Sequence, residues 1–335
     1  MRAVVLVGGF GTRLRPLTLS IPKPMLPIGH VPMIARLVDR LGRGGVTEVV
    51  LALGFRPEPF IEAFPDGLCG DVALTYAVEP EPLDTAGAIK FAAEFAGIDD
   101  TFVVANGDVM TDLDVSALVQ AHRSFGAEAT LHLIGVDDPS AFGVVDLAAD
   151  GAVRAFVEKP APGTEPSNLI NAGTYVFEPS VLDRIPPATK VSVERDTFQR
   201  LVADGGLYGV ATDDYWIDAG VPTLYRAANL DLLDGKRRTE RCDAVAPSAV
   251  VSPAATVDHS VIGAEVEVAA GASVVDSVLL PGASVGPGAT IERSLVMGAV
   301  GSGSVVRDSM VGAEGHVGDG ESLIEGTAPA LSLIH

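Results

Sequence analysis

The sequence predicts an α/β domain with a mixed, mostly parallel sheet, followed by a parallel β-helix of hexapeptide repeats. In the first part of the chain, apolar runs of strand length alternate with helical patterns. This alternation favours a mostly parallel sheet covered on both faces. After residue 244, aliphatic residues recur every six positions in a segment rich in Val, Ala, Gly and Pro. A length of 335 residues is sufficient for two domains.

The α/β part begins with a buried strand at 4–7. Further apolar runs predict strands at 48–53, 72–78, 102–105, 129–136 and near 215–218. Apolar residues at helical spacing predict helices at 33–41, 85–95, 115–125, 192–202 and 221–233. Asp114 is the expected N-cap of the third helix. Gly8, Gly9 and Asp108 each follow a strand, so we expect them at the one edge of the sheet where ligands bind.

The repeat after residue 244 has a period of about three hexapeptides. Aliphatic residues are spaced by six in three successive groups, at 245, 251 and 257, at 262, 268 and 274, and at 279, 285 and 291. Ser260, Ser277 and Ser294 recur at intervals of 17. This pattern is typical of a triangular β-helix and resembles the left-handed hexapeptide type. We expect about four coils, enough for neighbouring coils to bury their aliphatic positions.

A charged run from Lys236 to Arg241 marks the boundary between the two parts. We interpret it as a solvated linker. The predicted organisation is a first domain at 1–235, a linker at 236–243, a β-helix at 244–325 and a C-terminal tail at 326–335.

The composition excludes several classes of partner. Lys and Arg number 23 against 44 Asp and Glu, which gives a formal charge of −21. Such an acidic surface repels nucleic acid and anionic membranes. The two cysteines lack paired spacing, so neither a disulfide framework nor a structural zinc site is expected. There is no signal-peptide pattern and no apolar run of about 18 residues, so we expect a cytoplasmic protein without a membrane partner.

The most informative segment is the glycine-rich loop after the first strand, Gly8-Gly9-Phe10-Gly11-Thr12. A Rossmann or Walker loop would lead directly into a helix, but four prolines between 16 and 27 forbid a regular helix here. The segment is therefore predicted to be a long ordered loop. It carries Arg13, Arg15 and Lys23, which are suited to binding a polyphosphate without a helix dipole.

This segment resembles the signature of the sugar-nucleotidyltransferase (nucleotide-sugar pyrophosphorylase) family. The shared pattern is Gly-Gly-x-Gly-Thr-Arg-Leu-x-Pro-Leu-Thr, followed by Pro-Lys-Pro around Lys23. The resemblance implies a Rossmann-like nucleotidyltransferase domain followed by a left-handed β-helix. It also implies transfer of a nucleotidyl group from a nucleoside triphosphate to a sugar 1-phosphate, with Mg²⁺ as cofactor and release of pyrophosphate.

The resemblance assigns roles to particular residues. For the nucleotide, Arg13 and Lys23 would bind and activate the triphosphate. The remaining nucleotide-binding positions are Gly8, Gly9, Gly11 and Thr12 around the phosphates, Glu79 and Gly87 near the base, and Asp108. The two magnesium aspartates would be Asp108, in Asn-Gly-Asp, and Asp218, in Trp-Ile-Asp-Ala-Gly. For the sugar phosphate, Lys159 would hold the phosphate, and Gly143, Glu158 and Asn171 would contact the sugar. The expected catalytic set is Arg13, Lys23, Asp108, Lys159 and Asp218.

The mannose-1-phosphate guanylyltransferase branch is the most similar, so GTP and mannose 1-phosphate are the favoured substrates. Asp84 stands where the family usually has glycine, and the β-helix lacks the Gly-Trp segment of that branch. Glucose- or N-acetylglucosamine-1-phosphate transferases that use dTTP, UTP or ATP are the first alternative, and a non-catalytic regulatory subunit is the second. We interpret His259 and His316 as coil-surface residues rather than as acyl-transfer groups. A homo-oligomer, formed through the β-helix, is also expected.

Overall fold

The computed structural model describes residues 1–9, 11–54 and 57–330, and its contacts divide the chain into two compact units. The first unit contains Met1–Gly9 and Ile34–Trp216, and the second contains Phe10–Met33 and Ile217–His335. The N-terminal loop therefore groups with the C-terminal part of the chain, although the strand that precedes it belongs to the first unit.

The first unit is built on a sheet with the strand order β11-β10-β12-β7-β1-β4-β6-β5. Its centre is parallel and comprises β7 (Phe102–Asn106), β1 (Arg2–Leu6), β4 (Glu48–Leu53) and β6 (Val72–Val78). The flanking strands are β5 (Leu68–Cys69), β9 (Ala129–Gly135), β10 (Gly143–Leu147), β11 (Val153–Glu158), β12 (Leu169–Phe177) and β13 (Leu207–Thr212). Because β12 runs antiparallel to both β7 and β9, the sheet is mixed, as predicted.

Helices and turns connect these strands. They are α1 (Met33–Arg43), α2 (Glu58–Ala63), α3 (Asp84–Phe95), α4 (Val115–Phe125), α5 (Ser180–Asp183), the π-helical turn η4 (Val193–Thr197) and α6 (Phe198–Ala203). Asp114 caps α4 as predicted, since its carboxylate accepts a bond of 3.1 Å from the amide of Ala117. The helix expected at 192–202 is instead divided into η4 and α6. Two short strands, β8 (Val109–Thr111) and β14 (Trp216–Asp218), complete the list.

The N-terminal loop of the second unit is ordered without an α-helix in its described residues. It contains three 3-10 turns, η1 (Thr12–Leu14), η2 (Leu17–Leu19) and η3 (Lys23–Met25), and a short hairpin of β2 (Pro27–Ile28) and β3 (Val31–Pro32). Leu14 and Leu17 are fully buried. The same unit contains α7 (Pro222–Leu233), whose Tyr225 and Asn229 are also fully buried.

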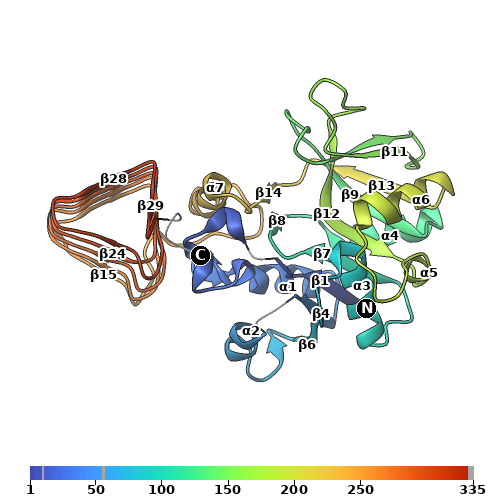
Figure 1. Ribbon diagram of the computed structural model, residues 1–335, viewed down its shortest axis with the longest axis horizontal. Helices are drawn as coiled ribbons and strands as arrows, with labels where there is room; N and C mark the ends of the chain where they lie inside the picture. Colours follow the sequence, from blue (N-terminus) through green and yellow to red (C-terminus); the bar gives the residue numbers. More distant parts are fainter. Residues whose placement is uncertain (10, 55–56, 331–335) are drawn as a thin grey trace. The chain divides into compact units, whose positions relative to one another are not determined.

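The β-helix is a three-sided stack of coils (Figure 1), with one five-stranded parallel sheet on each side. The first sheet is β15 (Val250–Val251), β18 (Glu267–Val268), β21 (Ser284–Val285), β24 (Ala299–Val300) and β27 (His316–Val317). The second is β16 (Thr256–Asp258), β19 (Ser273–Val275), β22 (Thr290–Glu292), β25 (Val305–Arg307) and β28 (Ser322–Ile324). The third is β17 (Val261–Ile262), β20 (Val278–Leu279), β23 (Leu295–Val296), β26 (Met310–Val311) and β29 (Thr327–Ala328).

The repeat positions fill the interior of this stack. The groups at 262, 268 and 274 and at 279, 285 and 291 are buried together. Val245 differs, because its side chain is 37% exposed. The recurring serines form a ladder in which each hydroxyl oxygen accepts a hydrogen bond from the backbone amide of the serine in the next coil. The Ser260 hydroxyl accepts from the Ser277 amide (3.0 Å), and the Ser277 hydroxyl accepts from the Ser294 amide (3.0 Å). The third sheet extends to Ala328, and residues 331–335 of the expected tail lie outside the described residues. No helix in the described chain is both long and apolar enough to cross a membrane.

Candidate functional site

In the first unit, the parallel strands end at one edge of the sheet. Leu6 of β1 pairs with Asn106 of β7, and the amide of Gly107 donates a bond of 2.9 Å to the carbonyl of Leu6. The glycine pair after β1 and Asp108 after β7 therefore leave the sheet side by side, as expected from the sequence. At the other side of β1, the amide of Glu79 donates to the carbonyl of Leu53 at the end of β4 (2.8 Å), so Glu79 shares this edge.

Close backbone approach explains why glycine is needed at this edge. A Cβ on Gly107 would lie 2.8 Å from Val7 Cγ1 and 2.9 Å from the carbonyl oxygen of Leu6. Gly9 has a φ of +152°, a conformation that side chains rarely allow. The turns at the ends of β1 and β7 therefore depend on residues without a side chain.

Glu79 and Asp84 shape the turn before α3. The Glu79 side chain is buried, and its carboxylate accepts a bond of 2.9 Å from the amide of Leu83. Burial raises the pKa of this carboxyl group. Asp84 has a φ of +60°, a left-handed conformation that favours glycine, and its carboxylate accepts a bond of 2.8 Å from the amide of Thr85. Aspartate thus preserves the turn.

Gly87 lies in the first half of α3, where the backbone of another segment comes close. A Cβ at this position would be 2.7 Å from the carbonyl oxygen of Thr189 and 2.7 Å from Leu83 Cβ. The amides of Ala86 and Gly87 both donate to the carbonyl of Val191. The glycine therefore lets this helix pack against the segment that precedes η4.

The predicted sugar-phosphate residues lie on β10, β11 and β12. Gly143 pairs with Glu158, and a Cβ on Gly143 would lie 3.0 Å from Glu158 Oε2. Lys159 has a φ of +51°, its amide donates to the carbonyl of Phe142 (2.9 Å), and its Nζ is 3.8 Å from Glu158 Oε1. The Lys159 side chain is 61% exposed, so its ammonium group is accessible to a phosphate.

Tyr175, on β12, links these residues to Asp108. The amide of the Asn171 side chain donates a bond of 2.9 Å to the Tyr175 hydroxyl. Burial raises the pKa of the Tyr175 phenol, and the negative charges of Glu194, Glu158 and Asp108 act in the same direction. Tyr175 therefore bonds to Asn171 and lies within the electrostatic influence of Asp108 and Glu158.

The structure adds Glu194, which the sequence indicated only as part of a helix start. Its Oε2 accepts bonds from the hydroxyls of Thr85 (2.9 Å) and Ser192 (2.8 Å). Burial raises the pKa of Glu158, and the charge of Glu194 is the second cause. No motif in the sequence marks Glu194, because its place in the site depends on the pairing of distant segments.

In the second unit, the predicted phosphate-binding cations meet the second predicted metal aspartate. A Cβ on Gly220 would lie 2.7 Å from Lys23 Nζ, 2.9 Å from Arg13 Nη2 and 2.7 Å from Asp218 Oδ1. The Gly220 amide donates a bond of 2.9 Å to that same carboxylate oxygen. Lys23 is only 8% exposed. Two cations and a carboxylate are thus gathered around one residue that has no side chain.

The loop that carries these cations is anchored at both ends of its path. Thr18 donates a bond of 2.8 Å from its hydroxyl to the carbonyl of Gly11, just before Thr12 and the turn η1. Further along, the Gly29 amide donates to the Asn229 side chain (2.8 Å), and the Tyr225 hydroxyl donates to the carbonyl of Pro27. Helix α7 therefore holds the hairpin that follows Lys23.

The predicted site residues fall in both units. The first unit contains Gly8, Gly9, Glu79, Gly87, Asp108, Gly143, Glu158, Lys159 and Asn171, and the second contains Gly11, Thr12, Arg13, Lys23 and Asp218. Among the described residues, no cluster of three or more His, Cys, Asp or Glu could hold a metal ion. Mg²⁺ usually binds one or two carboxylates and completes its shell with phosphate oxygens and water, so Asp108 and Asp218 are the donor type that it requires.

Comparison with known protein families agrees with this architecture. The family model described as "Nucleotidyl transferase" matches residues 2–235, and the model described as "GlmU-like, C-terminal hexapeptide" matches residues 228–311.

Three relatives and two solved structures extend this likeness. A mannose-1-phosphate guanylyltransferase of Mycobacterium tuberculosis is 41% identical, over 87% of this chain and 83% of its own length. A probable mannose-1-phosphate guanylyltransferase of Oryza sativa is 37% identical over 95% and 93%, and a mannose-1-phosphate guanyltransferase of Schizosaccharomyces pombe is 38% identical over 77% and 73%. HddC from Yersinia pseudotuberculosis, solved with GMP-PN, has a TM-score of 0.58 and 30% identity, and covers 68% of this chain and 97% of its own. A putative glucose-1-phosphate thymidylyltransferase from Bacillus anthracis has a TM-score of 0.60 and 26% identity, and covers 68% of this chain and 94% of its own.

Proposed function

Because the chain belongs to the nucleotidyl transferase family, we propose that it transfers the guanylyl group of GTP to mannose 1-phosphate. A phosphate oxygen of the sugar attacks the α-phosphorus, the bond from that phosphorus to the β-phosphate oxygen breaks, and GDP-mannose and pyrophosphate result. The observation that carries this proposal is the similarity to mannose-1-phosphate guanylyltransferases from a bacterium, a plant and a fungus, which extends through most of each chain.

Arg13 and Lys23 are the proposed triphosphate-binding residues. Their cationic ends lie within 3 Å of one point beside Gly220. Cations placed in this way before the reaction stabilise the charge that develops on the leaving pyrophosphate, and they require no rearrangement during it. The main task in such a reaction is alignment of two mutually repelling polyanions. In an acidic chain of charge −21, this local pair of cations supplies the attraction.

Asp108 and Asp218 are the proposed ligands of a divalent cation, and Mg²⁺ is the favoured ion. When bound, the ion would neutralise phosphate charge during the transfer. The Asp218 carboxylate is oriented by a hydrogen bond that it accepts from the Gly220 amide. Asp108 is set by the register of β7 against β1.

Lys159, Glu158 and Asn171 are the proposed sugar-phosphate residues. The exposed ammonium of Lys159 would hold the phosphate, while the carboxylate and the amide would accept and donate bonds to the sugar hydroxyls. Gly143 lets the Phe156 ring and the Glu158 carboxylate lie close to the backbone, since a Cβ there would be 2.4 Å from Phe156 Cζ.

Glu79 and Gly87 are the proposed base-binding positions. Guanine presents two neighbouring donors, N1–H and the 2-amino group, which adenine and the pyrimidines do not present together. A carboxylate is the matching acceptor. The buried Glu79 is therefore the side chain that we expect to favour guanine.

The test is pyrophosphate release in the presence of Mg²⁺ for GTP, dTTP, UTP, ATP and CTP, each combined with the 1-phosphates of mannose, glucose, N-acetylglucosamine and galactose. A dominant rate with GTP and mannose 1-phosphate is expected. The likeness to a putative thymidylyltransferase favours dTTP and glucose 1-phosphate as the second candidate. A dominant rate with that pair would overturn the proposed specificity, and silence with every pair would favour a regulatory subunit.

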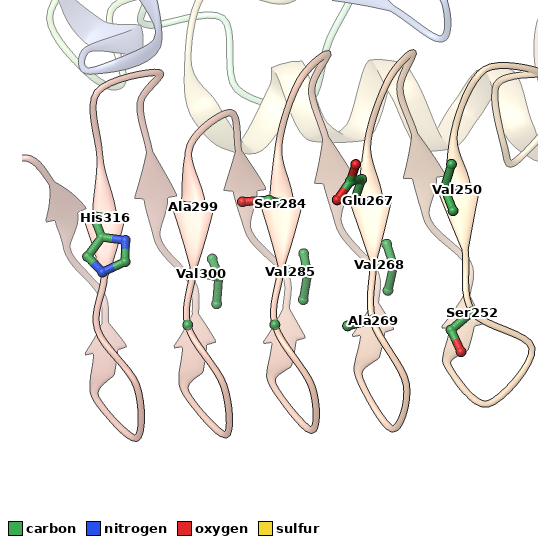
Figure 2. Close-up of a pocket in the computed structure, with 12 residues that line it drawn as sticks. Val250, Ser252, Glu267, Val268, Ala269, Ser284, Val285, Ala299, Val300 and His316 are labelled. Carbon is green, nitrogen blue, oxygen red and sulfur yellow. The ribbon is translucent and has the colours of Figure 1, made fainter.

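The first sheet of the β-helix is the surface that we propose for self-association of a cytoplasmic homo-oligomer. A hollow of about 560 Å³ runs along it (Figure 2). One residue from each coil lies along this face, in the order Val250, Glu267, Ser284, Ala299 and His316. In an antiparallel dimer, Glu267 of one copy would lie opposite His316 of the other copy. The small residues Ser284 and Ala299 would lie at the centre of this interface. Light scattering of the wild type and of Ser284→Arg tests this, and an unchanged mass would contradict it.

We also propose that the catalytic domain ends at residue 235.

A further inference from the structure

The loop that carries Arg13 and Lys23 also contacts the third sheet side of the β-helix. The Ser20 hydroxyl donates to the Met297 sulfur at 3.6 Å. Next to it, a Cβ on Gly312 would lie 2.8 Å from Pro16 Cβ and 3.0 Å from the carbonyl oxygen of Pro16. Distances below 3 Å are not tolerated by real side chains, so the loop occupies the space of the missing side chain.

The three atoms nearest to a Cβ on Gly312 all belong to Pro16 and not to the neighbouring coils. Leu279, Val296 and Val311 occupy one register in successive coils, so the residues that follow them, Leu280, Met297 and Gly312, are equivalent. The second and third coils carry large side chains at this position, whereas the first has Gly263, where a Cβ would lie 2.8 Å from the carbonyl oxygen of Leu279 in the next coil. Gly312 is also outside the left-handed φ region. At Gly263 the next coil limits the space for a side chain, whereas at Gly312 Pro16 limits it.

A displacement of Pro16 would be transmitted to the nearby cation Arg13. It joins turns η1 and η2, and its carbonyl accepts a bond of 3.2 Å from the Leu19 amide. On either side, Leu14 and Leu17 are fully buried, so the segment has little freedom to absorb a displacement. Arg13 lies three residues before Pro16, within η1.

We propose that Gly312 is a positioning residue for the nucleoside triphosphate. The fourth coil of the β-helix packs against the loop through Gly312 and so fixes the position of the loop. The loop in turn holds Arg13 and Lys23 beside Gly220. The β-helix would thus take part in nucleotide binding, in addition to any role in assembly. This inference rests on the proposed function only in assigning the two cations to the triphosphate.

The test compares Gly312→Ala with Ala313→Val. Ala313 is the next residue and is exposed, so the control adds bulk to the same turn away from the loop. For Gly312→Ala we expect the KM for the triphosphate to rise about tenfold, because a small misplacement of binding groups costs this much or more. The KM for the sugar 1-phosphate should stay close to that of the wild type. Pro16→Gly in the Gly312→Ala background removes the opposing Cβ and should recover part of the loss.

A folded Gly312→Ala protein with a wild-type triphosphate KM would overturn the proposal, and so would equal increases in both KM values. If this variant does not fold, Met297→Ala decides, since it removes the neighbouring contact with Ser20. We expect a two- to threefold higher triphosphate KM for it, about 0.5 kcal/mol of binding, and no change would refute the inference. The assay uses whichever substrate pair the wild type prefers, so a failure of the guanylyl assignment remains distinct. For an inert wild type, calorimetric binding of GTP with Mg²⁺ replaces KM.

Discussion

Lys23 Nζ and Asp218 Oδ1 lie at the same distance, 2.7 Å, from the point that a Cβ on Gly220 would occupy. The two residues are almost two hundred positions apart in the chain, and they meet because the N-terminal loop and β14 border on one glycine. Gly220 therefore leaves the room in which a buried ammonium group and a carboxylate lie close to one point.

Replacement of Gly220 by alanine should inactivate the enzyme without unfolding it. The added methyl group would displace Lys23, Arg13 or Asp218, and a misplacement of about 1 Å can cost about 100-fold in rate. We expect kcat/KM for pyrophosphate release to fall by about that factor. Gly135→Ala is the matched control, because a Cβ there would be at an ordinary 3.5 Å from the Asn168 side chain. Wild-type kinetics for Gly220→Ala would show that the cluster is not the phosphate site.

Asp108→Asn and Asp218→Asn test the proposed metal carboxylates. Each change keeps the size of the side chain but removes the negative charge that a hard divalent cation prefers. We expect kcat to fall by about 10²- to 10³-fold, the range found when one electrostatic group is lost from a site, together with a higher Mg²⁺ concentration at half-maximal rate. Asp146→Asn is the control, since Asp146 makes an exposed ion pair with Arg154 at 3.6 Å, which contributes little to stability. Either aspartate variant with near wild-type turnover in Mg²⁺ would contradict the assignment.

Local patterns were sufficient to predict much of the fold. The strands at 48–53 and 72–78 match the structure to the residue, because both are short, mostly apolar runs of strand length. The shared edge of Gly8 and Asp108 followed from the parallel sheet, and the β-helix followed from its six-residue period. In each of these cases, neighbouring residues in the sequence carry the information.

Long-range pairing could not be predicted in the same way. Strand β12 separates β7 from β9 in the sheet, and this arrangement places Tyr175 among Asp108, Glu158 and Glu194. The sequence does not show which strands β12 pairs with, since β7 and β9 are distant from it in the chain. The grouping of the N-terminal loop with α7 is likewise set by contacts such as Gly29 to Asn229, which join residues two hundred positions apart.

The serine ladder predicts a cost in stability for Ser277→Ala. The buried Ser277 hydroxyl donates to the carbonyl of Val275 (2.7 Å) and accepts from the amide of Ser294 (3.0 Å). Alanine would leave that buried amide without its partner, which costs about 1–3 kcal/mol. We expect the free energy of unfolding in urea to fall by this amount. Ser284→Ala, on an outer face, should change it by less than about 0.5 kcal/mol, and equal effects of the two changes would refute the ladder's role.

His259 should make stability depend on pH. Its ring lies between Asp276 (2.5 Å) and Asp234 (3.1 Å), and Lys236 faces Asp234 from the linker at 3.4 Å. The hydrogen bond to Asp276 is the main cause that raises the pKa of His259, and the charge of Asp234 adds to it. Because the folded pKa exceeds the unfolded value of about 6.5, the protonated ring favours the folded state. This contribution is complete below the unfolded pKa and is lost as the pH rises through the folded pKa.

The measurement is the melting temperature of the wild type and of His259→Gln between pH 5.5 and pH 8.5. We expect the wild type to be the more stable at the acidic end, and the difference to shrink as the pH rises, since glutamine cannot carry the charge that both aspartates attract. Ser322→Ala is the control, because it changes an exposed residue of the second β-helix sheet that does not titrate, and it should keep the wild-type slope. If His259→Gln followed the wild-type curve at every pH, the charge of the His259 ring would not contribute to stability through Asp234 and Asp276.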